Sequence, residues 1–352
     1  MNIAGHTLTH GRVFVIAELG VNHDGSLDTA LAMVDAAADA GADAIKTQYF
    51  KADRLLSRAA VLTAYQRSAG EADPAKMFAR LELTLDDHEN ILDRAHARGL
   101  AGIVTIFSAE HVNAAQHTGC DAFKSASPDI VNKPLLDALM ATGLPLLLST
   151  GAATLDEVTR TITWLKSDQA QNRTALMQCV SAYPVPQSEM ALDGIGALAH
   201  IFEGPVGYSD HTTEVDTGAL AVSKGAVVLE KHMTLDRTAQ GPDHAASLEP
   251  DDLRTYIAAA RHTASAAKLT PAAQSHIESK YVLDCEREAR QLSRQSVVSA
   301  KPIASGSIVR ADDLTIKRPG TGIGPWRLGE VIGRRAARNI EYDMPIDEED
   351  LA

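Results

Sequence analysis

Two histidines and two lysines in this sequence stand where they could support chemistry. His211 lies in the string SDHTT and His232 in LEKHMT, each directly after a short aliphatic run. Two imidazoles brought together can bind a divalent transition metal. Lys46 and Lys124 also end short aliphatic runs, and a lysine buried there needs an anionic partner because burial removes its hydration. We therefore expect a metal beside an anionic substrate.

Polar residues at the ends of other apolar runs extend this set. Hydroxyl side chains could give a phosphate or carboxylate several directional hydrogen bonds, and the candidates are Thr105, Ser127, Ser149, Ser181 and Ser209. Taken singly, each serine also fits a helix cap or a turn. Asp210 and Glu230 are neighbours of the two histidines in sequence. They could be further metal ligands or could orient the imidazoles.

Glu18, in the string AELGVNHDG, admits two interpretations. Its carboxylate could orient a water molecule or act as a base beside the metal and the lysines. It could equally form a buried ion pair with Lys46 or Lys231. The spacing of these residues does not separate the two roles.

A repeated pattern of elements must position these side chains. Short aliphatic runs alternate with Ala- and Leu-rich amphipathic segments up to about residue 268, which predicts an α/β protein of eight strand–helix units, a (β/α)8 barrel. The strands we expect are Val13–Glu18, Ala44–Gln48, Gly102–Ile106, Ala122–Ser125, Leu144–Ser149, Ala175–Val180, Val206–Ser209 and Val227–Lys231. The carboxyl ends of barrel strands share one face, so the polar strand ends should converge there.

The helices between these strands carry start and stop signals. Hydroxyl residues precede several amphipathic segments and predict helix starts at Ser26, Thr84 and Thr154. Glycines follow several segments and predict helix ends at Gly41, Gly99, Gly119 and Gly143.

The composition of the chain changes after the barrel. A charged stretch at 278–294 leads into a region with Gly and Pro that includes KRPGTGIGP at 317–325. We expect a barrel over residues 1–270, a linker over 271–293 and a small β-rich domain over 294–352. Within this domain, IASGSIVRADDL (303–314) and IEYDMPIDEEDL (340–351) share the spacing of their apolar residues and end on Asp-Leu. This similarity predicts an internal duplication.

Charge and cysteine content exclude several functional classes. The chain has 33 Lys and Arg against 46 Asp and Glu, a formal charge of −13, and no long basic run, so we expect no nucleic-acid partner. Its three cysteines have no close spacing, which argues against a disulfide framework. The start lacks a basic segment followed by a long apolar one, and no run reaches membrane-spanning length. We expect a cytoplasmic protein without a membrane partner.

Several strings together resemble the N-acetylneuraminate (sialic acid) synthase family, which includes legionaminate and related nonulosonate synthases. In order along nearly the whole chain they are AELGVNHDGSLDTA, AIKTQYF, FKSASPDI, LLLSTGAATLDEV, CVSAYPVP, VGYSDHTTE, VLEKHMTLDRTAQGPDHAASLEPDDL and IKRPGTGI. The resemblance implies a barrel enzyme followed by an SAF (antifreeze-like) domain. It also implies a domain-swapped homodimer, in which the Arg318 of one subunit reaches the active site of the other.

The same resemblance implies a reaction and a role for each matching residue. Phosphoenolpyruvate would condense with an N-acetylmannosamine-type sugar, giving a nine-carbon α-keto acid and phosphate. His211 and His232 would bind a divalent metal, Mn²⁺ or Mg²⁺, and Glu18 would serve the water or the aldehyde. The residues implied for phosphoenolpyruvate are Lys46, Thr105, Lys124, Ser127, Ser181 and Ser209, and those for the sugar are Gln48, Tyr183, Asp243 and Arg318.

Four departures from the family pattern concern the identity of the sugar. Pro128-Asp129 stands where Gly-Glu is common, Gln178 where His is common, and Met233 where Phe is usual. Arg294 lies near the place where one branch of the family has an aromatic residue. The metal pair and the lysines are unchanged, so these departures leave the reaction class as expected.

Two other classes of function remain open from the sequence. The barrel could belong to another phosphoenolpyruvate- or pyruvate-using aldol-type enzyme, such as one that forms a lysine Schiff base. The chain could also be a non-catalytic sugar-binding or scaffold protein. The sequence does not fix which amino sugar is accepted or which metal is physiological.

Overall fold

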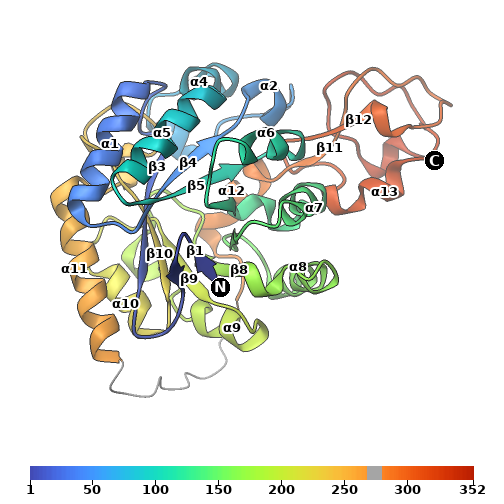
Figure 1. Cartoon of the computed structure of the whole chain (residues 1–352). Helices are drawn as coiled ribbons and strands as arrows, with labels where there is room; N and C mark the ends of the chain where they lie inside the picture. The colour runs from blue at the N-terminus through green and yellow to red at the C-terminus, as the bar shows by residue number, and fades with distance from the viewer. Residues whose placement is uncertain (268–279) are drawn as a thin grey trace.

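Eight parallel strands form a closed barrel, as the sequence predicts. The computed structural model describes residues 1–267 and 280–352 (Figure 1), so the start of the predicted linker lies outside the described residues. The barrel strands are β3 (Phe14–Gly20), β4 (Ala44–Tyr49), β5 (Ala101–Ile106), β6 (Ala122–Ser125), β7 (Leu146–Ser149), β8 (Thr174–Cys179), β9 (Val206–Asp210) and β10 (Val228–His232). They pair in chain order, and β10 pairs with β3 to close the barrel.

Helices surround the barrel and cover the outer face of its strands (Figure 1). Those of the strand–helix repeat are α1 (Leu27–Ala40), α5 (Leu85–Ala97), α6 (Val112–Gln116), α7 (Lys133–Ala141), α8 (Leu155–Ser167), α9 (Gly194–Ile201), α10 (Thr217–Ser223) and α11 (Pro250–Ala267). Three short helices are inserted between β4 and α5, namely α2 (Ala52–Leu55), α3 (Ala64–Ser68) and α4 (Pro74–Leu81). None of the helices in the described residues is long and apolar enough to cross a membrane.

The predicted helix signals are confirmed by backbone geometry. The side chains of Ser26, Thr84 and Thr154 accept hydrogen bonds from the first turns of α1, α5 and α8, which satisfies amide groups that the helix leaves free. The four predicted terminal glycines all have a positive φ, which only glycine adopts without strain; they are Gly41, Gly99, Gly119 and Gly143.

The interior of the barrel has an apolar layer and a polar layer. Side chains on one face of a strand alternate with those on the other, so every second residue of each strand points inward. At the amino ends of the strands these residues are apolar and include Phe14, Ile16 and Ile103. A short hairpin of β1 (Asn2–Ile3) and β2 (His6–Thr7) contributes Ile3 to the same cluster. At the carboxyl ends the inward residues are polar, which places the expected chemistry on a rigid apolar base.

The C-terminal residues form a small domain that projects to one side of the barrel (Figure 1). It contains β11 (Ser296–Ser299), β12 (Leu314–Lys317) and α13 (Leu328–Val331), and it has an apolar core of its own around Val297, Val309 and Ile346.

The two similar segments of the small domain have matching conformations. Ile303 and Ile340, the first residue of each segment, exchange both backbone hydrogen bonds at 2.9 Å. Near the end of each segment, an aspartate accepts from the amide three residues before it: Asp313 from Arg310 at 2.7 Å and Asp350 from Asp347 at 2.8 Å. The structure therefore agrees with an internal duplication.

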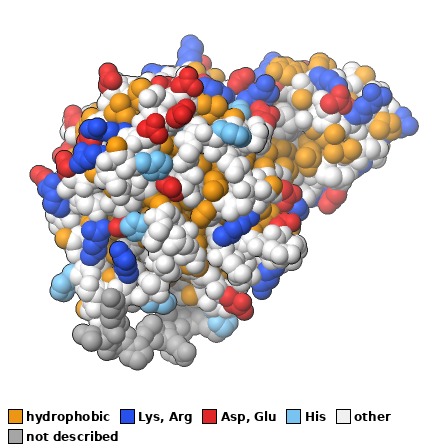
Figure 2. All heavy atoms as spheres, viewed as in Figure 1, with side chains coloured by type: hydrophobic (Ala, Val, Ile, Leu, Met, Phe, Trp, Pro, Cys, Tyr) orange, Lys and Arg blue, Asp and Glu red, His pale blue; other side chains and the backbone are white. Residues whose placement is uncertain are grey.

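The segment before the small domain is fixed to the barrel by partly buried ionic contacts. It contains α12 (Arg287–Ser293), and Glu157 of α8 accepts two hydrogen bonds each from Arg290 and Arg294 at 2.7–2.9 Å. Glu286 accepts hydrogen bonds from the amides of Ala152 and Ser181, at 2.6 and 2.8 Å. These two residues lie just beyond the ends of β7 and β8. Acidic and basic side chains are interspersed on the face of the molecule shown in Figure 2.

Candidate active site

The polar strand ends meet in an inner pocket within the mouth of the barrel. Its lining includes residues from all eight strands or from the positions directly after them. The predicted site residues that line this inner pocket are Glu18, Lys46, Gln48, Thr105, Lys124, Ser127, Tyr183, Ser209, His211 and His232. The structure therefore brings together most of the residues selected from the sequence.

Two lysines and two glutamates form a buried ionic cluster in this pocket. Lys46 Nζ lies 3.0 Å from Glu18 Oε1 and 3.9 Å from Glu230 Oε2, and Lys124 Nζ lies 3.0 Å from Glu230 Oε1. The side chains of all four residues are at most 4% exposed. The ion-pair interpretation of Glu18 is thus realised with Lys46, whereas Lys231 pairs with Asp210 on the outer face of the strands.

The two lysines of the cluster differ in their electrostatics, and so do its two glutamates. Burial lowers the pKa of Lys124, but at Lys46 the carboxylates of Glu18 and Glu230 outweigh burial and raise the pKa. Burial raises the pKa of Glu18 despite its contact with Lys46. At Glu230 the two lysines outweigh burial and hold the pKa well below its usual range. An ionised Glu230 thus faces two cations, and Glu18 takes up a proton more readily than an exposed glutamate.

Hydroxyl groups surround the ammonium groups of this cluster. Lys46 Nζ donates to Thr105 Oγ1 at 2.7 Å, and Ser209 Oγ donates to Glu230 Oε1 at 2.9 Å. Ser127 Oγ accepts from the amide of Gly151 at 3.0 Å. A Cβ atom at Gly151 would lie 2.4 Å from Ser181 Oγ and 2.8 Å from Ser127 Oγ, so the loop after β7 must approach both hydroxyls closely.

His211 and His232 lie side by side at the ends of β9 and β10. Their ring centroids are 5.4 Å apart, and the ring of Tyr183 lies 4.1 Å from that of His211. His211 Nδ1 is 2.8 Å from the carbonyl oxygen of Val180, an arrangement that leaves Nε2 free to bind a ligand. His232 Nδ1 is buried without a hydrogen-bond partner. Burial, and then the charges of His211 and Lys46, lower the pKa of His232 well below its usual value and so favour the neutral ring.

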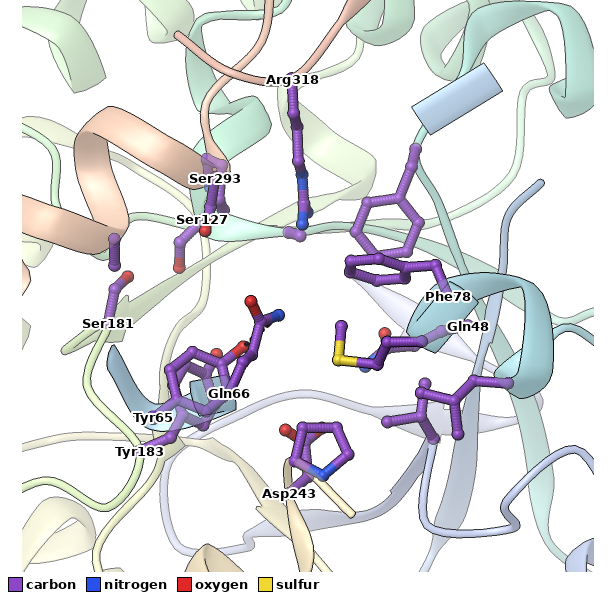
Figure 3. Close-up of a pocket in the computed structure, with 18 of the residues that line it drawn as sticks. Gln48, Tyr65, Gln66, Phe78, Ser127, Ser181, Tyr183, Asp243, Ser293 and Arg318 are labelled. Carbon is purple, nitrogen blue, oxygen red and sulfur yellow. Dashed lines mark hydrogen bonds between the residues drawn. The ribbon is translucent and has the colours of Figure 1, made fainter. Parts of the chain in front are cut away.

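An outer pocket adjoins the inner one and shares Gln48, Ser127, Tyr183 and His232 with it. The remaining predicted residues, Ser181, Asp243 and Arg318, line this outer pocket. In Figure 3, Ser127, Ser181 and Tyr183 lie on one side, Phe78 on the other, Arg318 above and Asp243 below. The apolar part of the lining includes Val21, Met77, Phe78, Leu81 and Phe107.

Arg318 reaches this pocket from the small domain of the same chain. Its amide donates to Leu55 O at 2.9 Å, and its carbonyl accepts from the amide of Ser57 at 3.0 Å. The described chain therefore has its pocket covered by its own Arg318. The exchange of small domains between two subunits stays a prediction.

Several residues of the outer pocket were not identified from the sequence. Tyr65, Gln66, Met77 and Phe78 belong to the insertion between β4 and α5. This segment contains no strand end, and the sequence predicts site residues only at strand ends and in family motifs. The amphipathic pattern of α4 could indicate a buried face, but not that the face borders a pocket.

Some sequence-based alternatives are corrected by the direction of side chains. Asp210 was considered as a ligand, but it points to the outer face, where its carboxylate lies 3.0 Å from Lys231 Nζ and accepts from Thr212. Glu230, the other alternative, points inward and contacts Lys124 rather than an imidazole. The directions of both side chains are explained by the alternation along a strand, because neighbouring residues face opposite sides of the sheet.

The residues that depart from the family pattern lie around the pocket rather than on its lysines. Pro128 lines the outer pocket, and Asp129 is fully buried behind it. Gln178 points away from the barrel interior and accepts from Lys280 Nζ at 2.8 Å. Met233 lies in the outer core. Arg294 is bonded to Glu157, so it contributes no side chain to the sugar side of the pocket.

Comparisons with known proteins agree with this geometry. The sequence pattern of the NeuB family matches residues 33–270, and that of the SAF domain matches residues 294–352. The chain is 35% identical to N,N'-diacetyllegionaminic acid synthase of Campylobacter jejuni over 96% of this chain and 99% of the relative. It is 30% identical to human N-acetylneuraminate-9-phosphate synthase over 96% of this chain and 92% of the relative.

A solved structure shares the whole arrangement of barrel and small domain. The spore coat polysaccharide biosynthesis protein SpsE of Bacillus subtilis superimposes with a TM-score of 0.85 at 30% identity, covering 100% of this chain and 99% of that one. Sequence and fold thus point to the same relatives over their full length. The chain belongs to the NeuB family and is an enzyme of this synthase type.

Proposed function

We propose that this enzyme condenses phosphoenolpyruvate with an N-acetylmannosamine-type amino sugar to give a nine-carbon α-keto acid and phosphate. The observation that carries the proposal is the buried pair Lys46 and Lys124 at the floor of a pocket that opens to the imidazoles of His211 and His232. The names of the relatives in Campylobacter and human, both acid synthases of this sugar class, support it.

The inner pocket suits the phosphate and carboxylate groups of phosphoenolpyruvate. Glu18 and Glu230 pair with the two ammonium groups before substrate binds, and this matters because an unpaired buried charge is costly. Each ammonium has three donors, so donors remain for a substrate anion alongside the protein contacts. The hydroxyl of Ser127 in the inner pocket, and that of Ser181 at its border with the outer pocket, can donate short directional bonds to its oxygens.

The outer pocket suits an N-acyl amino sugar because it has both polar and apolar sides. Gln48, Tyr183, Asp243 and Arg318 offer hydrogen bonds to hydroxyl and carbonyl groups. Met77, Phe78 and Leu81 present an apolar surface to the methyl group of an acyl substituent. The sugar aldehyde would then point toward the boundary of the two pockets, where His232 lines both.

The imidazoles of His211 and His232 fit a divalent metal, which we propose to be Mn²⁺ or Mg²⁺. His232 Nδ1 makes no hydrogen bond and lies 3.8 Å from Asp243 Oδ2, and the hydrogen bond at His211 Nδ1 leaves the other nitrogen free. No group of three or more His, Cys, Asp or Glu suited to a metal occurs in the described residues, so the protein would supply two ligands and leave positions for the substrate. When bound, such a metal acts as a Lewis acid that polarises the aldehyde.

The residues of the chain direct the remaining steps. C3 of phosphoenolpyruvate attacks the aldehyde carbon, and positive charge develops at C2. Glu18 Oε1 accepts from Gln48 at 2.6 Å while Oε2 is buried without a hydrogen bond, so Oε2 can accept the proton of a water molecule that adds at C2. The C2 hydroxyl then becomes the ketone as the C–O bond breaks, and phosphate leaves with the bonding electrons and the hydroxyl proton, held by Lys46 and Lys124. The proton on Glu18 passes to the alkoxide that the aldehyde has become.

A lysine Schiff-base aldolase is the second candidate, and one observation favours it. Burial lowers the pKa of Lys124, which would make its amine more nucleophilic. Borohydride reduction in the presence of pyruvate distinguishes the two, since it would attach the pyruvate carbons to Lys124 only in the aldolase.

The proposal is tested by incubating the enzyme with phosphoenolpyruvate, Mn²⁺ and a panel of amino sugars that includes N-acetylmannosamine and a diacetamido-trideoxyhexose. We expect phosphate release that depends on one of the sugars. The mass of the product should equal that of this sugar plus pyruvic acid. The absence of sugar-dependent phosphate release across the panel would reject the proposed function.

A further inference from the structure

Arg318 lies over the sugar side of the pocket without a charged partner in contact. Its guanidinium carbon lies 5.7 Å from the ring centre of Phe78 and 5.5 Å from that of Phe107. In the described residues no carboxylate lies within ion-pair distance of it, and its Nε is buried without a hydrogen bond. Figure 3 shows the side chain extending from the upper edge into the pocket. Two aromatic rings therefore hold the guanidinium while its terminal donors face the pocket.

Asp129 is the carboxylate whose charge acts on Arg318 from behind the pocket wall. It is 0% exposed and follows Ser127 and Pro128, which line the pocket. Its Oδ1 accepts from Asn132 Nδ2 at 3.1 Å and from Gln295 Nε2 at 3.0 Å, and its Oδ2 is unpartnered. Burial raises the pKa of Asp129 to about 6, although the charges of Arg318 and Arg294 oppose this shift.

Gln295 connects this carboxylate to the wall of the pocket and to the small domain. It directly precedes β11, and its side-chain amide donates to Asp129 Oδ1 at 3.0 Å and to the carbonyl oxygen of Phe107 at 2.9 Å. Phe107 is one of the two rings that contact Arg318. The buried side-chain amide of Gln295 therefore links Asp129, which attracts Arg318, to Phe107, whose ring contacts Arg318.

We infer that Asp129 and Gln295 are positioning residues that hold Arg318 over the sugar without contacting the sugar themselves. The inference rests on the proposed function. In a buried site a charge acts over a longer distance than in water, so Asp129 favours the guanidinium in this place. Because the two groups do not form a direct ion pair, the terminal N–H groups of Arg318 stay available for hydroxyl and carbonyl oxygens of the substrate.

The replacement Asp129→Asn tests this role because it keeps the Oδ1 acceptor and removes the charge. We expect the KM for the amino sugar to rise about tenfold, the loss of one modest charge interaction, while the KM for phosphoenolpyruvate stays the same. Asp129→Glu should restore part of the effect. The matched control is Asp137→Asn, an exposed aspartate of α7 that pairs with Lys133 and should change neither constant.

A double-mutant cycle with Arg318→Met separates positioning from a general effect on structure. If Asp129 acts through Arg318, Asp129→Asn causes no further rise in the sugar KM once Arg318 is absent. Equal effects of Asp129→Asn in both backgrounds, or a parallel rise in both substrate constants, would overturn the inference.

Hydrogen exchange provides a readout that does not depend on the reaction. The Arg318 amide donates to Leu55, and we expect peptides covering 314–322 to exchange faster in Asp129→Asn and in Gln295→Ala than in the wild-type protein. Unchanged exchange in both variants would overturn the inference even if no sugar proved to be a substrate. Lack of wild-type activity, with the expected exchange, would reject the proposed function alone.

Discussion

At the residue scale, the active site depends on how its buried charges are balanced. Lys46, Lys124, Glu18 and Glu230 are at most 4% exposed and lie within contact of one another. Removing one partner of a buried pair leaves a charge that neither water nor protein compensates. The ion pairs of the cluster therefore stabilise one another in the free enzyme. The remaining N–H groups of Lys46 and Lys124 can bind an anion.

Replacing Lys124 should affect one substrate far more than the other. In Lys124→Gln, Glu230 loses its contact at 3.0 Å and the pocket loses a cation. We expect kcat/KM for phosphoenolpyruvate to fall about 100-fold, as for loss of one electrostatic contact in a buried site, with little change in the KM for the sugar. Steady-state kinetics with each substrate varied in turn measures this. Lys133→Gln, on the exposed face of α7, is the matched control, and equal losses in the two variants would contradict the assignment.

The titration of Asp129 should make stability depend on pH. Burial raises its pKa in the folded chain to about 6, above the ordinary value of 3.8 for an aspartate. The folded state therefore binds more protons than the unfolded state between these values, and stability falls as pH rises through this window. We expect Asp129→Asn to gain stability relative to the wild type as pH rises from 4 to 7, by at most about 3 kcal/mol. Chemical unfolding at several pH values tests the sign, and a constant difference between the two proteins would contradict it.

At the element scale, the regular alternation of strand side chains explains why much of the site could be predicted. Strand ends are readable from aliphatic runs, so Lys46, Lys124 and the two histidines were placed correctly on one face of the barrel. An aliphatic run does not show to which side the last residue of a strand points. Asp210, the last residue of β9, faces outward. Tyr65 and Phe78 could not be predicted because they lie on short helices between β4 and α5, away from any strand end.

The loop after β7 has no room for a side chain, which gives a prediction at this scale. A Cβ atom in Gly151→Ala would lie 2.4 Å from Ser181 Oγ and 2.8 Å from Ser127 Oγ. We expect both hydroxyls to be displaced and the KM for phosphoenolpyruvate to rise about tenfold or more, as displacements of this size reduce catalysis. Gly329→Ala, where no atom lies within 4 Å, is the matched control. Normal kinetics in Gly151→Ala would show that these hydroxyls do not bind the substrate.

The contact between α8 and α12 should contribute strongly to stability. Glu157 accepts from both Arg290 and Arg294, and these contacts outweigh burial and hold its pKa far below the usual range. We expect Glu157→Ala to lower the free energy of unfolding by about 3 kcal/mol, because it leaves two partly buried arginines unpaired. Chemical unfolding compared with the exposed variant Glu203→Ala tests this. Equal stability of the two variants would contradict the role of this contact.

At the scale of the whole molecule, the active site needs the small domain as well as the barrel. Arg318 comes from a turn that the sequence marks only by the string KRPG, and its place above the pocket depends on contacts with Leu55 and Ser57 in another part of the chain. The sequence could indicate a second domain from its change in composition. It could not indicate how that domain docks, because docking is decided by buried contacts such as that of Gln295 with Asp129.

Removal of divalent metal should abolish activity without unfolding the protein. His211 directly follows β9 and His232 ends β10. The pairing of these two strands does not require a metal, so we expect chelation to leave thermal unfolding nearly unchanged. Activity should return with Mn²⁺ or Mg²⁺. Full activity in the presence of excess chelator would contradict a role for His211 and His232 as metal ligands.

Condensation with C–O cleavage is tested most directly with phosphoenolpyruvate that carries ¹⁸O in the bridging position between C2 and phosphorus. Condensation with C–O cleavage predicts that the label leaves with phosphate, in equal amount to a nine-carbon α-keto acid detected by mass. Label retained in the organic product, or phosphate released without any new carbon–carbon bond, would contradict the account.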